Sequence, residues 1–254
     1  AADDRLASLT LLAAQTDFTE PGELELFIDH SEVALLEGMM WGRGYLDRHQ
    51  MAGAFQLLRS NDLIWSRMLR EYLMGERAPM NDLMAWNADA TRMPYRMHSE
   101  YLRQMFLENS LASGRTMVDG HPVAIQNIRV PIFAVGTEWD HVAPWHSVFK
   151  IHALSDTDVT FALTNGGHNA GIVSPPSHPR RHFRLRHKPT EEPVIGPEEW
   201  LATTAPQDGS WWPAWEAWLI RHSAAKQVPP PATGAARKGY PAIADAPGTY
   251  VFQT

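Results

Sequence analysis

Two short loops each carry a residue that can handle protons. Asp140 lies in Gly136-Thr137-Glu138-Trp139-Asp140-His141, and His168 lies 28 positions further on in Asn165-Gly166-Gly167-His168-Asn169-Ala170-Gly171. An imidazole titrates near neutral pH and can act as a general base, and a carboxylate on its far ring nitrogen fixes the tautomer. Glycines beside the histidine permit tight backbone turns and close approach of a substrate. The spacing therefore predicts the acid and the base of a nucleophile–base–acid triad.

The third member of the triad is not visible. The chain contains no cysteine and no Gly-x-Ser-x-Gly turn of the kind that exposes a catalytic serine. In hydrolases of that class the order along the chain is nucleophile, acid, histidine, so the nucleophile is expected well before Asp140. The sequence opens Ala1-Ala2-Asp3-Asp4 without a methionine. We expect that the front end, with the nucleophile, has been removed.

Other polar residues compete for these roles. Asp17 is the rival acid, because it also follows an apolar run, and His141 is expected to shape the loop beside the acid. A metal site is not expected from His168 and the later histidines, because their spacing fits no closed zinc pattern and arginines lie between them. The later histidines are His178, His182 and His187. The basic run 180–188 is interpreted as a solvated face, with a role in binding phosphates of coenzyme A left open.

Three apolar runs predict strands that position the loops. Residues 7–14, 130–136 and 158–164 are the runs, and the first is expected to be buried on both faces. Residues 144–153 leave room for a crossover helix, so the last two strands should be parallel with a right-handed connection. Asp140 and His168 then emerge at the same edge of one sheet.

The remaining segments show other patterns. Helical spacing runs through 23–77 and 98–107, with a non-helical stretch at 86–94, so most of 19–108 is interpreted as a helical insertion. Residues 181–188 predict an edge strand blunted by charge, and 211–220 predict an amphipathic helix that starts near Pro213. The last thirty residues are expected to form an extended tail because they are rich in Pro, Ala and Gly.

Composition restricts the class of protein. At 254 residues with 44% hydrophobic and 20% charged residues, the chain has the make-up of a globular protein. A formal net charge of −7 argues against a nucleic-acid binder. No apolar run reaches the roughly 20 residues that span a bilayer, and the lack of cysteine excludes disulfides and thiolate metal sites within the chain.

Several motifs together resemble one family. Residues 131–145, 166–173 and 210–215 closely resemble the C-terminal half of polyhydroxyalkanoate synthases, and residues 86–94 and 246–252 match that family too. The resemblance covers nearly the whole chain. It implies an α/β-hydrolase fold, here the C-terminal part of the parallel sheet, with residues 1–18 and 109–254 as the core and 19–108 as a helical cap.

The resemblance also implies an activity. Polyhydroxyalkanoate synthases are acyltransferases that polymerise 3-hydroxyacyl-coenzyme A into polyester and release free coenzyme A. On the family pattern His168 is the general base that activates a cysteine, and Asp140 is the acid that orients the histidine or helps to activate the incoming 3-hydroxyl. The cysteine is expected in a Gly-x-Cys-x-Gly elbow within about 40 residues upstream of this chain. The chain alone is therefore predicted to be inactive.

Partners follow from the same resemblance. They are 3-hydroxyacyl-coenzyme A, the growing polyester, the surface of a polyester granule in the cytoplasm and, in the full-length enzyme, a second copy. No cofactor is expected beyond the coenzyme A of the substrate. Two alternatives stay open: an esterase or polyester depolymerase with a serine elbow, and a non-catalytic fragment that binds granules or an intact synthase through exposed tryptophans.

Overall fold

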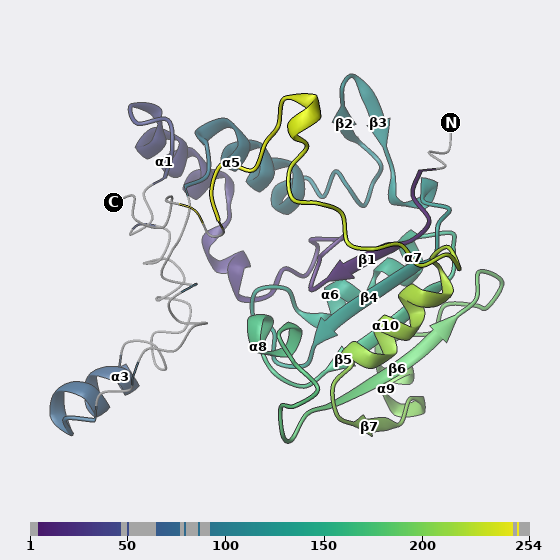
Figure 1. The fold of residues 1–254 in the computed structure, drawn as a ribbon. Coiled ribbons are helices and arrows are strands. Elements are labelled where there is room, and N and C mark those ends of the chain that lie inside the picture. Colours follow the sequence, from purple (N-terminus) through teal and green to yellow (C-terminus); the bar gives the residue numbers. More distant parts are fainter. Residues whose placement is uncertain are drawn as a thin grey trace.

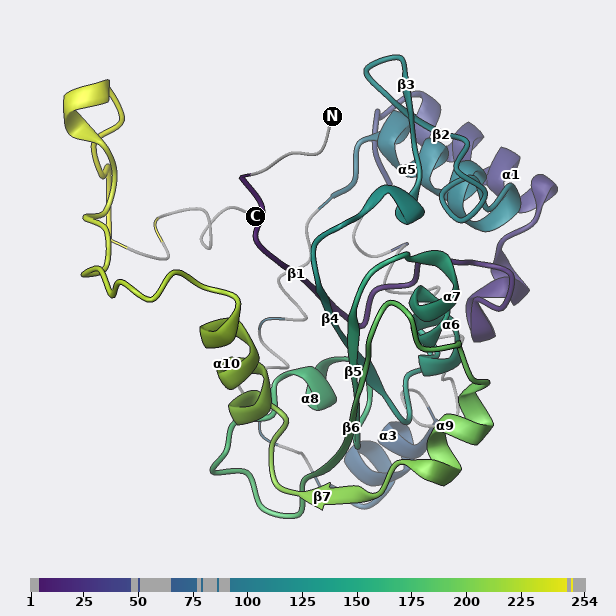
Figure 2. The ribbon, with the colours of Figure 1, turned by 90° about the vertical axis from the view of Figure 1, so that its right-hand side faces the viewer.

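The computed structural model describes residues 5–46, 50, 65–76, 79, 86, 92–245 and 248. A five-stranded sheet with helices on both faces forms its centre (Figure 1, Figure 2). The strand order is β1-β4-β5-β6-β7, with β1, β4 and β5 parallel and β6 and β7 antiparallel to their neighbours. The fold is therefore of the α/β class.

The elements have the following bounds. The strands are β1 Leu9–Leu12, β2 Thr116–Val118, β3 His121–Val123, β4 Ile132–Thr137, β5 Val159–Thr164, β6 His182–Lys188 and β7 Pro206–Asp208. The α-helices are α1 His30–Trp41, α3 Ser66–Met68, α5 Tyr95–Tyr101, α6 Trp145–Phe149, α7 Ile151–Leu154, α8 His168–Ile172, α9 Pro197–Thr203 and α10 Trp212–Arg221. The 3-10 helices are η1 Gly22–Phe27, η5 Ile125–Asn127 and η6 Ala236–Lys238, and π-helical turns form η3 Leu69–Leu73 and η4 Leu102–Leu107.

The middle strands β4 and β5 are buried along their whole length. Their continuous apolar runs are typical of parallel strands that helices cover on both faces. On one face Ile132 and Ala134 pack with aromatic residues of α6 and α9, and on the other face Phe133 and Val135 pack against α10. α6 and α7 form the crossover between β4 and β5 (Figure 2). The predicted parallel pair and its crossover helix are confirmed.

The first strand differs from its prediction. β1 pairs with β4 in the parallel register Leu9 to Ile132, but its residues are only partly buried and Leu12 is 42% exposed. Within the described residues, no strand pairs with its outer side. β1 is therefore an edge strand among the described residues, and the expectation that it is buried on both faces is wrong, because its side chains are only partly covered.

The prediction for the charged strand β6, on the other side of the sheet from β1, is also corrected. β6 was expected at the edge, but β7 pairs with its first three residues, from His182 opposite Asp208 to Arg184 opposite Pro206. β7 has only three residues and all are exposed. The sequence signal for it is weak, because proline is tolerated only at an edge strand and the run has no apolar residue.

The segment between β1 and β4 is largely helical where it is described. It contains η1, α1, α3, η3, α5 and η4, and Asp29 caps α1 by accepting hydrogen bonds from the backbone N–H groups of Ser31 and Glu32. Residues 47–49, 51–64, 77–78 and 87–91 of the predicted helical and non-helical stretches lie outside the described residues. Trp86 is helical, although the stretch 86–94 was expected to be non-helical.

A β2–β3 hairpin was not predicted. It turns at Asp119 and Gly120, which both have positive φ (49° and 77°). An Asp-Gly pair is a strong signal for such a two-residue turn, so the sequence did contain the information. The division of the chain at residues 18 and 109 stays a prediction.

The helix predicted near the C-terminus is confirmed, because α10 begins at Trp212 with Pro213 in its first turn. Residues 224–245 are exposed and irregular apart from η6 and a bridge between Ala235 and Tyr240, and residues 246–247 and 249–254 of the predicted tail lie outside the described residues. In the part of the chain that the structure describes, no helix is long and apolar enough to cross a membrane.

Candidate active site

The structure brings His168 and Asp140 together. Asp140 follows the end of β4, and His168 is the first residue of α8, just after β5. Because β4 and β5 are paired and parallel, their carboxyl ends lie side by side, which is where α/β sheets place functional loops. His168 Nδ1 lies 2.8 Å from Asp140 Oδ2. The prediction that the two loops are neighbours is confirmed.

The Asp140 carboxylate is buried, and both of its oxygens accept hydrogen bonds. Its side chain is 0% exposed. Besides His168, Thr137 Oγ1 donates to Oδ2 at 3.1 Å, and the N–H groups of Val142 and Ala143 donate to Oδ1 at 2.9 and 2.8 Å. Burial alone would raise the pKa of Asp140, but the hydrogen bonds from His168, Ala143 and Val142 outweigh it and lower this pKa. The acid is therefore ionised at neutral pH.

The charge of Asp140 sets the tautomer of His168. An ionised carboxylate can only accept hydrogen bonds, so Nδ1 must carry the proton that lies between the two residues. In the neutral ring Nε2 is then the basic nitrogen. The His168 side chain is 36% exposed, whereas that of Asp140 is not exposed at all. The pair thus presents a base toward the outside with its orienting acid behind it.

The short helix α8, which carries His168, is fixed by direct packing on the sheet. Gly171 lies so close to β4 that a Cβ at this position would come within 2.5 Å of Thr137 Cγ2. Thr137 in turn donates to Asp140. Gly171 therefore sets how near the histidine helix lies to the strand that leads to the acid.

Residues at the start of α10 hold the other end of α8. Trp211 Nε1 donates to the Gly171 carbonyl at 3.1 Å, and Trp212 Nε1 donates to the Ile172 carbonyl at 3.0 Å. Carbonyl groups at the end of a helix lack partners within the helix, so these indoles satisfy them. The sequence analysis did not predict that these tryptophans hold α8. The pair of adjacent tryptophans could have indicated it, because each is a large apolar side chain with a single hydrogen-bond donor.

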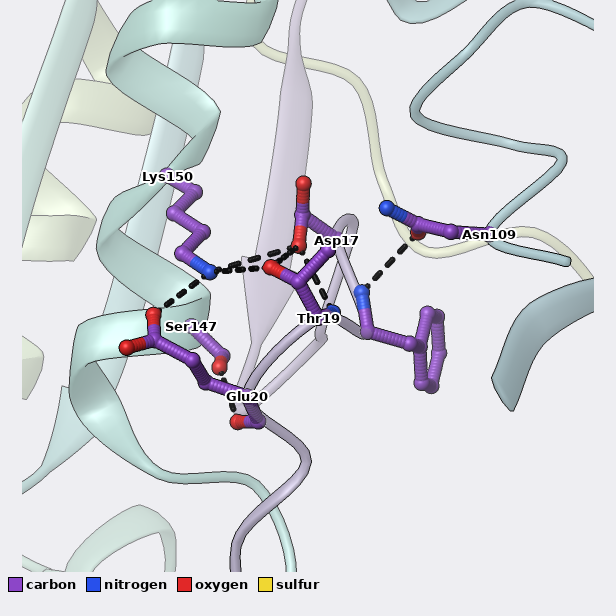
Figure 3. Close-up of polar contacts among 7 residues, drawn as sticks. Asp17, Thr19, Glu20, Asn109, Ser147 and Lys150 are labelled. Atoms are coloured by element: carbon purple, nitrogen blue, oxygen red, sulfur yellow. Dashed lines mark hydrogen bonds and ion pairs between the residues drawn. The ribbon is translucent and has the colours of Figure 1, made fainter. Parts of the chain in front are cut away.

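Asp17, the rival acid, has different partners. Its Oδ1 accepts from the Thr19 N–H at 2.9 Å and from Lys150 Nζ at 3.3 Å (Figure 3). Lys150 also contacts Glu20 Oε2 at 2.6 Å. The neighbouring Phe18 N–H donates to Asn109 Oδ1 at 3.0 Å. Burial would raise the pKa of Asp17, but hydrogen bonds from Thr19 and Asn109 and the charge of Lys150 lower it. Asp17 therefore anchors the segment that follows β1 to the crossover helices.

His141 lies beside the acid, as its position in the sequence requires. It lines a hollow of about 560 Å³ together with Trp139, Asp140 and Pro144 and with Gly22 and Glu23 of η1. Trp139 is 69% exposed. The hollow is a shallow depression of the surface next to the acid loop. The role of His141 in shaping the loop stays a prediction.

The other histidines are dispersed over separate partners. His178 Nδ1 contacts the Pro179 carbonyl, His182 Nε2 lies 3.5 Å from Glu138 Oε1, and His187 Nδ1 contacts Thr160 Oγ1. Among the described residues, no group of three or more His, Cys, Asp or Glu side chains is arranged to hold a metal ion.

Most of the basic run near β6 is used internally. Arg181 donates to the carbonyls of Ala170 and Asn165, Arg184 donates to Thr204, and Arg186 contacts Glu192. These side chains brace α8 and the α9 region. A site for coenzyme A phosphates on this run therefore gains no support from the contacts.

Comparison with known proteins shows similarity to one group of polymerases. The chain is 42% identical to a poly(3-hydroxyalkanoate) polymerase of Methylorubrum extorquens over 250 residues, which is 97% of this chain. It is 38% identical to the poly(3-hydroxyalkanoate) polymerase subunit PhaC of Rhizobium meliloti over 98% of this chain. It is also 37% identical to the corresponding subunit of Cupriavidus necator over 96% of this chain. The chain is related to the poly(3-hydroxyalkanoate) polymerases.

The aligned region makes up nearly all of this chain but less than half of each polymerase. The matching region is 40%, 39% and 42% of the three relatives, so the chain spans about two fifths of their length. No family model matches the chain. The predicted resemblance to polyhydroxyalkanoate synthases is confirmed.

Proposed function

We propose that this chain carries the acid and the base of a thiol acyltransferase site that polymerises 3-hydroxyacyl-coenzyme A into polyester. The observation that carries the proposal is the 2.8 Å contact between His168 Nδ1 and Asp140 Oδ2, in a chain related to poly(3-hydroxyalkanoate) polymerases. The proposed framework is an α/β-hydrolase core of residues 1–18 and 109–254 with a helical cap of residues 19–108. The parallel strands β1, β4 and β5 and the loops at their ends support that framework.

The proposed reaction divides the proton transfers between the two residues. His168 Nε2 takes the proton of a cysteine thiol, and the thiolate attacks the thioester carbonyl of the substrate. A bond from the acyl carbon to the enzyme sulfur forms, the bond to coenzyme A breaks, and the leaving thiolate receives the proton from His168. Asp140 stabilises the imidazolium between these steps, or helps to activate the 3-hydroxyl that attacks next.

The nucleophile of this reaction is not among the 254 residues, because they contain no cysteine. The chain by itself is therefore proposed to release no coenzyme A. Coenzyme A enters as part of the substrate, and no further cofactor is proposed. The proposal extends to granule association in the cytoplasm and to a dimer of the full-length enzyme, in keeping with the family.

A chimera tests the proposed function. This chain replaces the matching 40% of the Methylorubrum extorquens polymerase, and release of free thiol from 3-hydroxybutyryl-coenzyme A is measured. We expect the chimera to be active. His168→Ala should reduce its rate at least about 10⁴-fold, because the nucleophile loses its base. Granule binding that is indifferent to His168→Ala in an inactive chimera would favour the non-catalytic alternative. Hydrolysis of a 3-hydroxybutyrate ester, with no release of free thiol from 3-hydroxybutyryl-coenzyme A, would favour the esterase.

A further inference from the structure

The segment that leads from β1 into η1 runs along helix α6 in the opposite direction. Its start is held by Lys150, directly after α6, whose Nζ lies 3.3 Å from Asp17 Oδ1. Nearly one helical turn earlier, Ser147 Oγ donates to the Glu20 carbonyl at 2.6 Å (Figure 3). We call residues 17–22 the strap. It connects the crossover helix to the helical segment between β1 and β4.

The last residue of the strap lies against the turn that carries the acid. Gly22 has a positive φ of 72°, and a Cβ at this position would lie 2.7 Å from Cγ of Pro144 and 3.7 Å from the His141 carbonyl oxygen. Only glycine fits, because it has no Cβ and adopts a positive φ without strain. The backbone of the strap therefore packs directly on the turn of residues 140–144.

The same turn orients the acid through its backbone. The N–H groups of Val142 and Ala143 donate to Asp140 Oδ1 at 2.9 and 2.8 Å. Burial raises the pKa of Asp140, and both of these bonds act in the opposite direction and lower it. Since the donors are backbone groups, their direction is set by the path of the turn. A displaced Pro144 would therefore turn the donors away from the carboxylate that orients His168.

Lys150 fastens the strap at the end remote from the acid. Besides Asp17, its Nζ contacts Thr19 Oγ1 at 2.7 Å and Glu20 Oε2 at 2.6 Å. The side chains of Lys150 and Asp17 are 26% and 17% exposed, so solvent screens their pair less than it screens an exposed pair. An ammonium group has three donors, and here all three oxygen partners lie on the strap. Lys150 therefore holds the strap in one register along α6.

The strap also joins the two ends of the helical segment. The Phe18 N–H donates to Oδ1 of Asn109, two residues after η4, at 3.0 Å (Figure 3). Asn109 has a positive φ of 47°, which asparagine adopts more readily than most residues. The helical segment thus begins and ends at the strap, so the position of its ends and that of the turn of residues 140–144 are fixed together.

We propose that Gly22 and Lys150 are positioning residues for the acid–base pair. Gly22 keeps the turn of residues 140–144 in the path that directs its two N–H donors at the Asp140 carboxylate, and Lys150 keeps the strap on α6. Both act through the acid and not on the substrate. Their role rests on the proposed function, in which Asp140 and His168 are the acid and the base.

Amide exchange in the chain itself tests the positioning without catalysis. Hydrogen exchange of the Val142 and Ala143 amides is followed by NMR. Gly22→Ala adds a Cβ that the Pro144 ring cannot accommodate, so exchange of both amides should rise at least about tenfold. The matched control is Gly120→Ala, because Gly120 has a similar positive φ of 77° but nothing within 4 Å of its Cβ position. It introduces the same backbone strain and should leave both amides unchanged.

Further variants separate the contact from the strain. Pro144→Ala removes the ring carbon nearest to the new Cβ, so Gly22→Ala/Pro144→Ala should recover most of the protection although the strain at residue 22 remains. Lys150→Met should raise exchange of the same two amides by a smaller factor, about threefold, because the strap loses its fastening. Lys150→Arg keeps the charge and should raise the exchange less than Lys150→Met does.

The chimera shows whether the positioning matters for the reaction. Gly22→Ala should lower kcat about tenfold and change KM by less than about twofold, because the acid is misplaced while the substrate binds as before. Gly120→Ala should keep the full rate, and Gly22→Ala/Pro144→Ala should regain most of it. A purely structural role would lower the urea stability of both glycine variants and leave kcat of the folded enzyme unchanged.

Either of two results overturns the proposal: amide exchange in Gly22→Ala that equals that in Gly120→Ala, or a double variant no better than Gly22→Ala. If Gly22→Ala does not fold, Lys150→Met decides, and unchanged exchange of both amides overturns the role of the strap. Failure of the proposed function looks different. His168→Ala would then leave the chimera active, while amide exchange in the turn would still depend on Gly22.

Discussion

Two aspartates of this chain follow neighbouring parallel strands of one sheet, yet they meet different partners. Asp140, after β4, contacts the imidazole of His168, whereas Asp17, after β1, contacts the ammonium group of Lys150. In both cases burial opposes ionisation and hydrogen bonds more than compensate, so both pKa values are lowered. The two carboxylates are alike in charge, but they contact different groups, and the Asp17 side chain is 17% exposed whereas that of Asp140 is not exposed.

The partner decides what each carboxylate can do. An imidazole gains and loses a proton near neutral pH, so Asp140 holds a group that can take part in proton transfer. Burial would lower the pKa of Lys150, but Glu20 and Asp17 raise it, so its ammonium group keeps its proton. The Asp17 pair is therefore a structural anchor. The comparison teaches that the neighbouring side chain decides whether a carboxylate at a strand end can take part in proton transfer.

The largest expected effect separates the two aspartates by activity. In the chimera, Asp140→Asn should reduce thiol release about 10⁴-fold, because the amide no longer enforces the correct tautomer of His168. Asp17→Asn, the matched variant, should reduce it less than about tenfold, because His168 does not contact Asp17. Equal losses in the two variants would abolish the distinction between acid and anchor.

A smaller effect is expected from the distance between the histidine helix and the acid strand. Gly171→Ala places a methyl group against Thr137, so α8 must shift and His168 moves with it; we expect about a 100-fold loss of activity. Gly167→Ala is the control, because its Cβ would meet only the Trp139 carbonyl at 3.6 Å. Thr137→Ser removes the methyl group nearest to the new side chain and should restore part of the activity of Gly171→Ala. An inactive Gly167→Ala variant with an active Gly171→Ala variant would contradict this account.

The smallest effect concerns acid stability, in which the two aspartates should behave alike. A carboxylate whose pKa is lower in the folded state stabilises the fold above its unfolded pKa, near 3.8, and this contribution is lost as the pH falls through the folded value. Asp140→Asn and Asp17→Asn should each reduce the loss of unfolding free energy between about pH 6 and pH 3, by on the order of 1 kcal/mol. Urea unfolding of the chain at both pH values measures it. An unchanged pH dependence in either variant would show that its carboxylate is not stabilised by folding.

Much of the core could be predicted from local patterns. The apolar runs that became β4 and β5 are so continuous that burial on both faces was the simplest interpretation, and it is correct. The same reasoning failed for β1, because an apolar run does not reveal how fully other parts of the chain cover the two faces of the strand. β7 was missed because three exposed residues around a proline give no periodic signal.

The site was predictable only in part, because local patterns reveal some of its residues and not others. His168 and Asp140 are recognisable from their loops, since the chemistry needs an imidazole beside glycines and a carboxylate one strand away. Thr137, Gly171, Trp211 and Trp212 support them through contacts between segments far apart in the chain. Such contacts have no fixed spacing in the sequence, so no sequence pattern predicts them.

The sequence by itself determined the α/β class, the parallel pairing of the strands before the two loops, the two residues that can handle protons, and the absence of a thiol within the chain. These depend on residue type and on short-range periodicity, which the chain displays directly. Only the tertiary structure decided that Asp140 rather than Asp17 meets His168, and that Gly171, Trp211 and Trp212 hold the histidine helix against the strand that leads to the acid. Both depend on which side chains come together when the strands align, and that geometry arises from packing over the whole domain.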